Sequence, residues 1–384
     1  MRELISNNTR VVQVLVYLTL LCTSMQTGIA QPDAQFEFTY DEGVPEEYID
    51  AFEYSLSVLS GYFNSDEPIT AHVKYDSLDA SIGAKCSPNY NVALTSTIID
   101  LVPLGSPLSN YWNGEVPVPT GVIRIPAALH NSLAGSDQNG FTKDMVVTMN
   151  SNPAVASNYS AAIPPDTLPS SDLSLVNTII HEVIHGLGFV AGIPSMARPA
   201  PTFCDDTVNF NFDPNLAPTQ FSSLLQYGDS YLPERLLDVG NPNAAIRDTV
   251  TGIHWFGEFG IDGTHHGIRP EICSNLRCWG TDPSVSNCTD SNGCIDRGSS
   301  LSHLDTVRVV ENCDTVNYFP VMFFSGTTAQ PITQIDPISL GIMQDIGWSI
   351  DCTNPGCTMP GACNYDFMAC PKEGLFDDEC VFGD

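Results

Sequence analysis

The order of hydrophobic and polar residues predicts strands and helices near the start of the chain. Apolar and polar residues alternate in Phe36–Tyr40 and in Ile69–Tyr75, as they do in half-buried β-strands. Between these segments, apolar residues recur at three- and four-residue spacing over Pro45–Phe63. This spacing predicts an amphipathic helix with a proline near its start.

The pattern becomes less regular further along the chain. Residues 86–120 are rich in Pro, Asn, Ser and Gly, which predicts loops with short strands, whereas Gly121–Ile125 and Met145–Met149 are predicted to be strands. Residues 190–300 are loop-rich and cysteine-rich, and so long a stretch predicts an insertion into a domain. Regular patterning resumes at Leu301–Val310.

The strongest predicted helix covers Ser170–Leu187, with Ser170, Ser171 or Asp172 as its cap. Its apolar residues form one stripe: Val176, Ile179, Ile180, Val183, Ile184 and Leu187. Many of them are β-branched, so burial must stabilise this helix. A last helix is predicted over Ile338–Trp348 and closes near Gly347.

Residues 1–30 have the features of a secretory signal peptide. Arg2 and Arg10 are followed by a 12-residue apolar stretch that is too short to span a bilayer, and Gly28-Ile29-Ala30 offers a cleavage site before Gln31. No later segment reaches 18 apolar residues. We therefore expect a secreted protein without a membrane anchor after the signal peptide is removed.

Charge excludes one class of partner. The chain has 45 acidic and 14 basic residues and a formal net charge of −31. Nucleic-acid binding requires a basic patch, and this composition predicts none. The 42% of hydrophobic residues in 384 residues are enough for a large folded core.

The cysteines indicate an oxidising compartment. Twelve of the thirteen remain after Cys22 leaves with the signal peptide, and an even number in a secreted chain favours disulfides over a metal cluster. Five of them lie in 352–384, which predicts a small disulfide-dependent module. Within it, Gly356–Asp366 and Asp377–Cys380 resemble a short cysteine repeat found at the ends of secreted bacterial proteins.

The chemistry is concentrated in His181-Glu182-Val183-Ile184-His185, an HExxH motif on the strongest helix. Two histidines four residues apart lie on one helical face, so both imidazoles can bind one Zn²⁺. Glu182 beside them is placed to accept a proton from water that attacks a carbonyl group. From the His and Glu content of this chain, the motif arises by chance roughly once in a hundred such chains.

A hydrolytic zinc site usually has three protein ligands. The short extension HExxHxxGxxH fails here, because position 191 is Ala. The remaining downstream histidines are His254, His265, His266 and His303, and Asp305 would make an aspartate-ligated site, so the residues alone leave the third ligand open. A glutamate such as Glu234 or Glu258 would make a thermolysin-like site, but neither lies in the helical context that this site requires.

Three segments together carry a resemblance to a known family. They are HEVIHGLGF at 181–189, Ser302-His303-Leu304-Asp305, and Pro320-Val321-Met322-Phe323 followed by Leu340–Trp348. They resemble the metzincin peptidases, and specifically the leishmanolysin-like branch, in which the third histidine follows a long insertion and precedes a methionine turn. The resemblance covers residues 36–350, except that the insertion is poorly matched.

This resemblance implies an α+β fold of two subdomains, with a twisted mixed sheet and the active-site helix above a loop-rich lower half. It implies that His181, His185 and His303 hold one catalytic zinc, that Glu182 is the general base and that Met322 is the turn methionine. It also implies that an edge strand, for which we expect Met145–Met149, pairs with an extended peptide substrate. Tyr318 is close enough in sequence to be considered for stabilising the oxyanion.

These inferences divide the chain into a signal peptide (1–30), a catalytic domain (31–350) with an insertion (190–300), and a cysteine-rich module (352–384). The predicted function is a secreted zinc endopeptidase acting on proteins or peptides. Two alternatives stay open: an inactive adhesion or binding protein on a protease scaffold, and a zinc hydrolase of non-peptide amides or esters. Acidic loops at Asp205-Asp206 and Asp213 offer oxygen ligands for Ca²⁺, without an ordered ligand pattern. The sequence leaves the oligomeric state open.

Overall fold

The computed structural model describes most of the chain between residues 33 and 190 and shorter segments after it. The described residues are 33–80, 82–94, 97–98, 101, 122–140, 142–169, 171–190, 219–227, 230–231, 253–255, 303–304, 307–311, 314–318, 320–323 and 331–351. The chain divides into two units, 1–32 and 33–384, and all described residues belong to the second. The predicted signal peptide, most of the predicted insertion and the cysteine-rich module lie outside the described residues.

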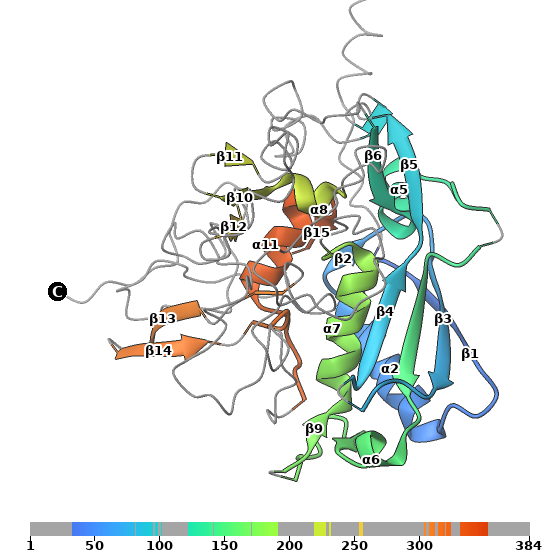
Figure 1. Cartoon of the computed structure of the whole chain (residues 1–384), viewed down its shortest axis with the longest axis vertical. Coiled ribbons are helices and arrows are strands. Elements are labelled where there is room, and N and C mark those ends of the chain that lie inside the picture. Colours follow the sequence, from blue (N-terminus) through green and yellow to red (C-terminus); the bar gives the residue numbers. More distant parts are fainter. Residues whose placement is uncertain are drawn as a thin grey trace, which may run out of the picture. The chain divides into compact units, whose positions relative to one another are not determined.

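A four-stranded sheet forms the framework of the described residues, and its strand order is β1-β3-β7-β4 (Figure 1). β1 (Phe36–Tyr40), β3 (Ile69–Asp76) and β7 (Met145–Asn150) run parallel, and β4 (Ala84–Pro88) pairs antiparallel with β7. Ile69, Ala71 and Val73 of β3 are buried, in agreement with the alternation of apolar and polar residues in this segment. β7 is buried at nearly every position, as expected for a strand with neighbours on both sides. The three parallel strands confirm the strands predicted at these positions.

The prediction of an edge strand at Met145–Met149 is wrong. β7 lies between β3 and β4, so its backbone is already paired on both sides. The two edges of this sheet are β1 and β4, and most of β4 lies in the segment 86–120, which the sequence predicted only as loops with short strands. Its residues Ala84-Lys85-Cys86-Ser87-Pro88 lack the β-branched residues that mark a strand in sequence, and pairing with β7 is what makes them extended.

Two helices pack on the sheet and on each other. α2 (Glu46–Ser60) confirms the helix predicted over this region, and its buried residues repeat at helical spacing toward β1 and α7. α7 (Leu175–Leu187) packs against β4, β7 and α2 (Figure 1). The hydroxyl of Ser55 donates to the carbonyl of Val176 at 3.4 Å and so links the two helices inside the core.

The predicted start of α7 was too early. The helix begins at Leu175, and its cap is Ser174 rather than a residue of 170–172. The reason is tertiary: β9 (Leu173–Ser174) pairs with β8 (Tyr159–Ser160), which holds the chain extended up to the cap.

The C-terminal end of the described chain packs against elements from its N-terminal part. α11 (Pro337–Asp345) is nearly all buried, and β15 (Ser349–Ile350) pairs with β2 (Phe63–Asn64). The indole of Trp348 donates to the carbonyl of Leu187 at 2.9 Å, at the end of α7. These contacts fix α11 beside α7 although the two helices are far apart in sequence.

The remaining elements are short. Pairing strands are β5 (Tyr90–Leu94) with β6 (Val122–Pro126), β10 (Leu225–Tyr227) with β11 (Ser230–Tyr231) and β12 (Ile253–Trp255), and β13 (Val307–Glu311) with β14 (Asp314–Tyr318). The helices are α5 (Ala127–Ala134), α6 (Pro153–Ala156) and α8 (Gln220–Ser223). The fold of the described residues is therefore α+β with open sheets, as predicted at the level of fold class.

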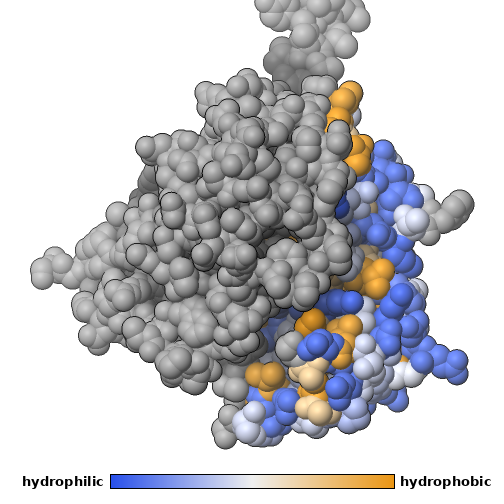
Figure 2. All heavy atoms as spheres, in the orientation of Figure 1, coloured by the Kyte–Doolittle hydropathy of each residue, from blue (hydrophilic) through white to orange (hydrophobic). Residues whose placement is uncertain are grey.

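On the face shown in Figure 2, the described part is mainly hydrophilic and carries several apolar areas. The most exposed large apolar side chains are Val92 and Leu94 of β5. No helix among the described residues is both long and apolar enough to cross a membrane.

One cysteine departs from the pairing that the even cysteine count favoured. Cys86 on β4 is a free thiol, and the other cysteines of the predicted mature chain lie outside the described residues. Burial and the nearby charge of Glu182 raise the pKa of the Cys86 thiol well above its usual value. The thiol therefore stays protonated and unreactive.

Candidate metal centre

Helix α7 brings two of the predicted ligands together. The hydroxyl of Ser174 accepts a hydrogen bond from the backbone N–H of Asn177 at the start of the helix. Gly188 ends it with φ +125°, and a Cβ there would lie 2.9 Å from Pro126. Between these ends, His181 and His185 are one helical turn apart on the same face, as predicted.

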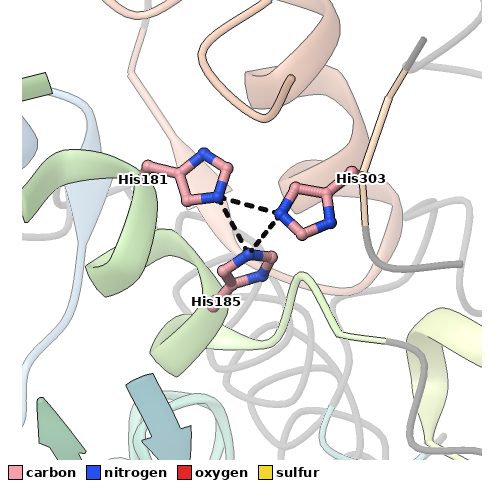
Figure 3. Close-up of side chains that lie close together, drawn as sticks. All are labelled: His181, His185 and His303. Carbon is pink, nitrogen blue, oxygen red and sulfur yellow. Dashed lines mark hydrogen bonds between the residues drawn. The ribbon is translucent and has the colours of Figure 1, made fainter. Parts of the chain in front are cut away.

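His303 completes a triangle with these two histidines (Figure 3). Its Nε2 lies 3.0 Å from Nε2 of His181 and 3.2 Å from Nε2 of His185. The Nε2 atoms of His181 and His185 are 3.1 Å apart. The side chains of His185 and His303 are buried, whereas His181 keeps part of its surface exposed. His303, the third residue of the group, is the ligand that the family resemblance implied.

Backbone carbonyls fix which nitrogen atoms carry protons. Nδ1 of His181 donates to the carbonyl oxygen of Val321 at 2.8 Å, and Nδ1 of His185 donates to that of Phe189 at 2.6 Å. Since a neutral imidazole carries one proton, Nε2 of each ring presents a lone pair. The two lone pairs point toward the same small space as Nε2 of His303.

This arrangement fits a metal cation. Two nitrogen lone pairs at 3.1 Å repel each other unless a positive charge lies between them. In a tetrahedral zinc site with Zn–N distances of about 2.0–2.1 Å, the ligand nitrogens are roughly 3.3 Å apart. The separations of 3.0–3.2 Å are close to this value. Burial lowers the pKa of His181 and of His185, which keeps both rings neutral and able to bind a metal.

A tight turn joins the third ligand to the helix. Phe323 N–H donates to the carbonyl of Pro320 at 2.9 Å, which closes the turn over Met322. The Met322 side chain is fully buried, and its carbonyl accepts the N–H of Leu304, the residue after His303, at 2.9 Å. The turn methionine predicted at position 322 therefore lies in a turn that contacts both ligand-bearing segments.

Glu182 lies on α7 beside the histidines and faces the edge strand. Its carboxylate accepts a hydrogen bond from the backbone N–H of Cys86 on β4. Burial raises the pKa of Glu182 to about 7, and this hydrogen bond opposes the shift. A carboxyl group with a pKa in this range can both accept and return a proton near neutral pH.

Other predicted candidates lie outside the description. Asp305, His265 and His266, which were the alternative third ligands, are outside the described residues, as are Glu234 and Glu258. The same holds for Asp205, Asp206 and Asp213 of the calcium hypothesis. The backbone of Tyr318 belongs to β14, but its side chain is outside the description.

The groups around the ligands were not predicted. They are the carbonyls of Val321 and Phe189, which bind the rings of His181 and His185, and Asp336, which accepts the N–H of Val321. The carbonyls of Val321 and Phe189 leave no trace in sequence, because any residue supplies a carbonyl. Asp336 was missed although a signal was present. The segment Asp336-Pro337-Ile338-Ser339 has an N-cap residue followed by proline, which marks a helix start one residue before the predicted one.

The histidines of the centre come from two segments of the chain: His303 follows His181 by 122 residues and His185 by 118 residues. Their convergence therefore depends on the fold as a whole rather than on one local motif. Comparison with protein-family models, with curated proteins and with solved structures finds no match for this chain.

Proposed function

We propose that this protein is a secreted zinc endopeptidase related to the leishmanolysin-like metzincins. The observation that carries the proposal is the convergence of three histidine Nε2 atoms within 3.2 Å of one another. Glu182 lies on the same helix as His181 and His185. Three imidazole ligands favour zinc among common biological cations and leave one position of a tetrahedral site for water or substrate. Met322 and the late position of His303 support the metzincin type.

Each residue has a role in this proposal. His181, His185 and His303 hold the metal, and the carbonyls of Val321 and Phe189 keep two of the rings in the tautomer that binds it. When bound, zinc would supply Lewis-acid polarisation of the scissile carbonyl and make the attacking water more acidic. A carboxylate oxygen of Glu182 takes the proton from this water and delivers it to the leaving amine.

The edge strand supports a peptide as the substrate. The N–H of Cys86 points away from β7, since it donates to Glu182 instead. On this side β4 pairs with no strand among the described residues, and it faces the proposed catalytic carboxylate. An extended peptide that adds to this edge would present its backbone beside Glu182, which is a common way to bind peptides of varied sequence.

The test measures metal content and proteolysis together. Secreted mature protein is assayed for bound zinc and for casein cleavage as wild type, as Glu182→Ala and as Glu46→Ala, a control glutamate exposed on α2. We expect one zinc per chain in all three proteins, and a loss of cleavage by about a hundred- to ten-thousand-fold in Glu182→Ala alone.

Each alternative outcome has a defined meaning. Cleavage that survives in Glu182→Ala would refute the role of this carboxylate. Zinc binding without cleavage of casein or peptides by the wild type would refute the peptidase proposal. Hydrolysis of small esters or amides by that protein would then indicate a non-peptide hydrolase, and no hydrolysis at all would indicate a binding protein.

A further inference from the structure

The turn Pro320–Phe323 touches both parts of the candidate metal centre. Its Val321 carbonyl accepts the proton of His181 Nδ1, and its Met322 carbonyl accepts the N–H next to His303. A shift of this turn would therefore move one ring directly and one ligand-bearing segment with it. What holds the turn in place then matters for the geometry of the centre.

Asp336 holds the turn. One carboxylate oxygen, Oδ2, accepts the backbone N–H of Val321 at 2.8 Å and the hydroxyl of Ser339 at 2.8 Å. The other, Oδ1, accepts the backbone N–H of Ser339 at 2.8 Å and thereby caps α11. The side chain is 1% exposed, so these bonds are made without competition from water.

The contacts form a continuous chain from α11 to a ligand. α11 is buried in the core, and Asp336 is its N-cap. The backbone of Val321 links this carboxylate to the His181 ring, with its N–H bonded to the carboxylate and its carbonyl oxygen bonded to the ring. Because the N–H and the carbonyl of Val321 are joined through its Cα, holding the N–H limits the movement of the carbonyl that orients His181. Groups that orient a ligating imidazole typically alter metal affinity by about ten- to a hundred-fold when they are removed.

We propose that Asp336 is a positioning residue for the metal centre, acting through the backbone of Val321 on the ring of His181. The inference rests on the proposed metal site but not on the reaction that the site performs. Asp336 contacts no ligand itself in this chain of bonds. Its effect should therefore appear in metal affinity, whether or not a substrate is present.

Two substitutions separate this role from helix capping. Asp336→Ser keeps a hydroxyl that can cap α11, but its single oxygen cannot occupy the positions of both carboxylate oxygens, so the N–H of Val321 loses its acceptor. Asp336→Asn keeps one carbonyl oxygen for the cap and turns the other oxygen into an N–H donor that repels the N–H of Val321. We expect both variants to be folded and to bind zinc about ten- to a hundred-fold more weakly.

Two control variants have matched chemistry. Ser339→Ala removes a hydroxyl from the same carboxylate and leaves both backbone hydrogen bonds in place. Asp144→Asn alters another buried aspartate, which is 1% exposed and bonded to Thr70 and Asn131 in the sheet region. Both controls should lower thermal stability while the zinc dissociation constant stays within about twofold of the wild-type value.

The measurement is the zinc dissociation constant of the full mature chain, determined by competition with a chelator, together with the thermal unfolding temperature. Wild-type affinity in both Asp336 variants would overturn the proposal, as would an equal loss of affinity in Asp144→Asn, which would indicate general destabilisation. If the wild type binds zinc but cleaves no peptide, only the proposed function fails. If the wild type takes up no zinc, both proposals fail.

Discussion

Gly186 shows how the absence of a side chain shapes the centre. A Cβ at this position would lie 2.3 Å from the sulfur of Met145 and 2.7 Å from the sulfur of Cys86. Both distances are too short for any real contact. The glycine therefore lets α7 approach β4 and β7 closely, which brings Glu182 to the edge strand.

Gly186→Ala should destabilise the protein. The thioether of Met145 can swing aside, but the thiol of Cys86 is short and held by its strand, so the helix must move away from β4. We expect a loss of about 1–3 kcal/mol in the free energy of unfolding. Urea denaturation measures it, and the double variant Gly186→Ala with Cys86→Ala should recover part of the loss. An alanine that costs nothing would show that the helix is not constrained here.

At the scale of elements, α7 depends on its cap. The Ser174 hydroxyl accepts the Asn177 N–H at 3.2 Å, and β9 delivers the chain to this position in an extended conformation. Ser174→Ala should lower the free energy of unfolding by about 1 kcal/mol. Ser171→Ala, at a position that the sequence offered as the cap, should have almost no effect. Equal losses in the two variants would contradict this assignment of the cap.

Most long elements could be predicted from sequence. β1, α2 and β3 follow from periodic burial, since one face of each is in the core. β7 and α11 are buried at nearly every position and follow from their high apolar content. β4 could not be predicted, because Lys85, Ser87 and Pro88 have no strand-forming preference and only the pairing with β7 makes them extended. The start of α7 was also missed because of a pairing: β8 holds β9 extended up to Ser174, and the residues of β8 are not part of the helical pattern.

At the scale of the whole molecule, the three metal ligands could be predicted, but the groups that hold them in position could not. The spacing of His181 and His185 identifies two ligands, and His303 was favoured by resemblance rather than by spacing. Asp336 and the carbonyl of Val321 act from a third segment, and only the fold brings them to His181. The location of β4 beside Glu182 is likewise a property of the sheet order.

Alkaline pH should destabilise the described core. Burial raises the pKa of Tyr40 and of Tyr48 to about 12, whereas a phenol in an unfolded chain has a pKa of 10.0. Between these values the unfolded state releases protons that the folded state retains, so stability falls as pH rises. Unfolding in urea should show this fall above pH 10, with a smaller slope in Tyr48→Phe. An identical slope in the two proteins would contradict a retained proton on Tyr48.

The central claim is that His181, His185 and His303 hold one metal ion together. The most direct measurement is the metal content of purified mature protein, by elemental analysis, for the wild type and for His303→Ala. We expect one zinc per wild-type chain and loss of that zinc in the variant, with His72→Ala, a partly buried histidine of β3 outside the centre, as a control that keeps it. A full zinc complement in His303→Ala, or none in the wild type, would contradict the account.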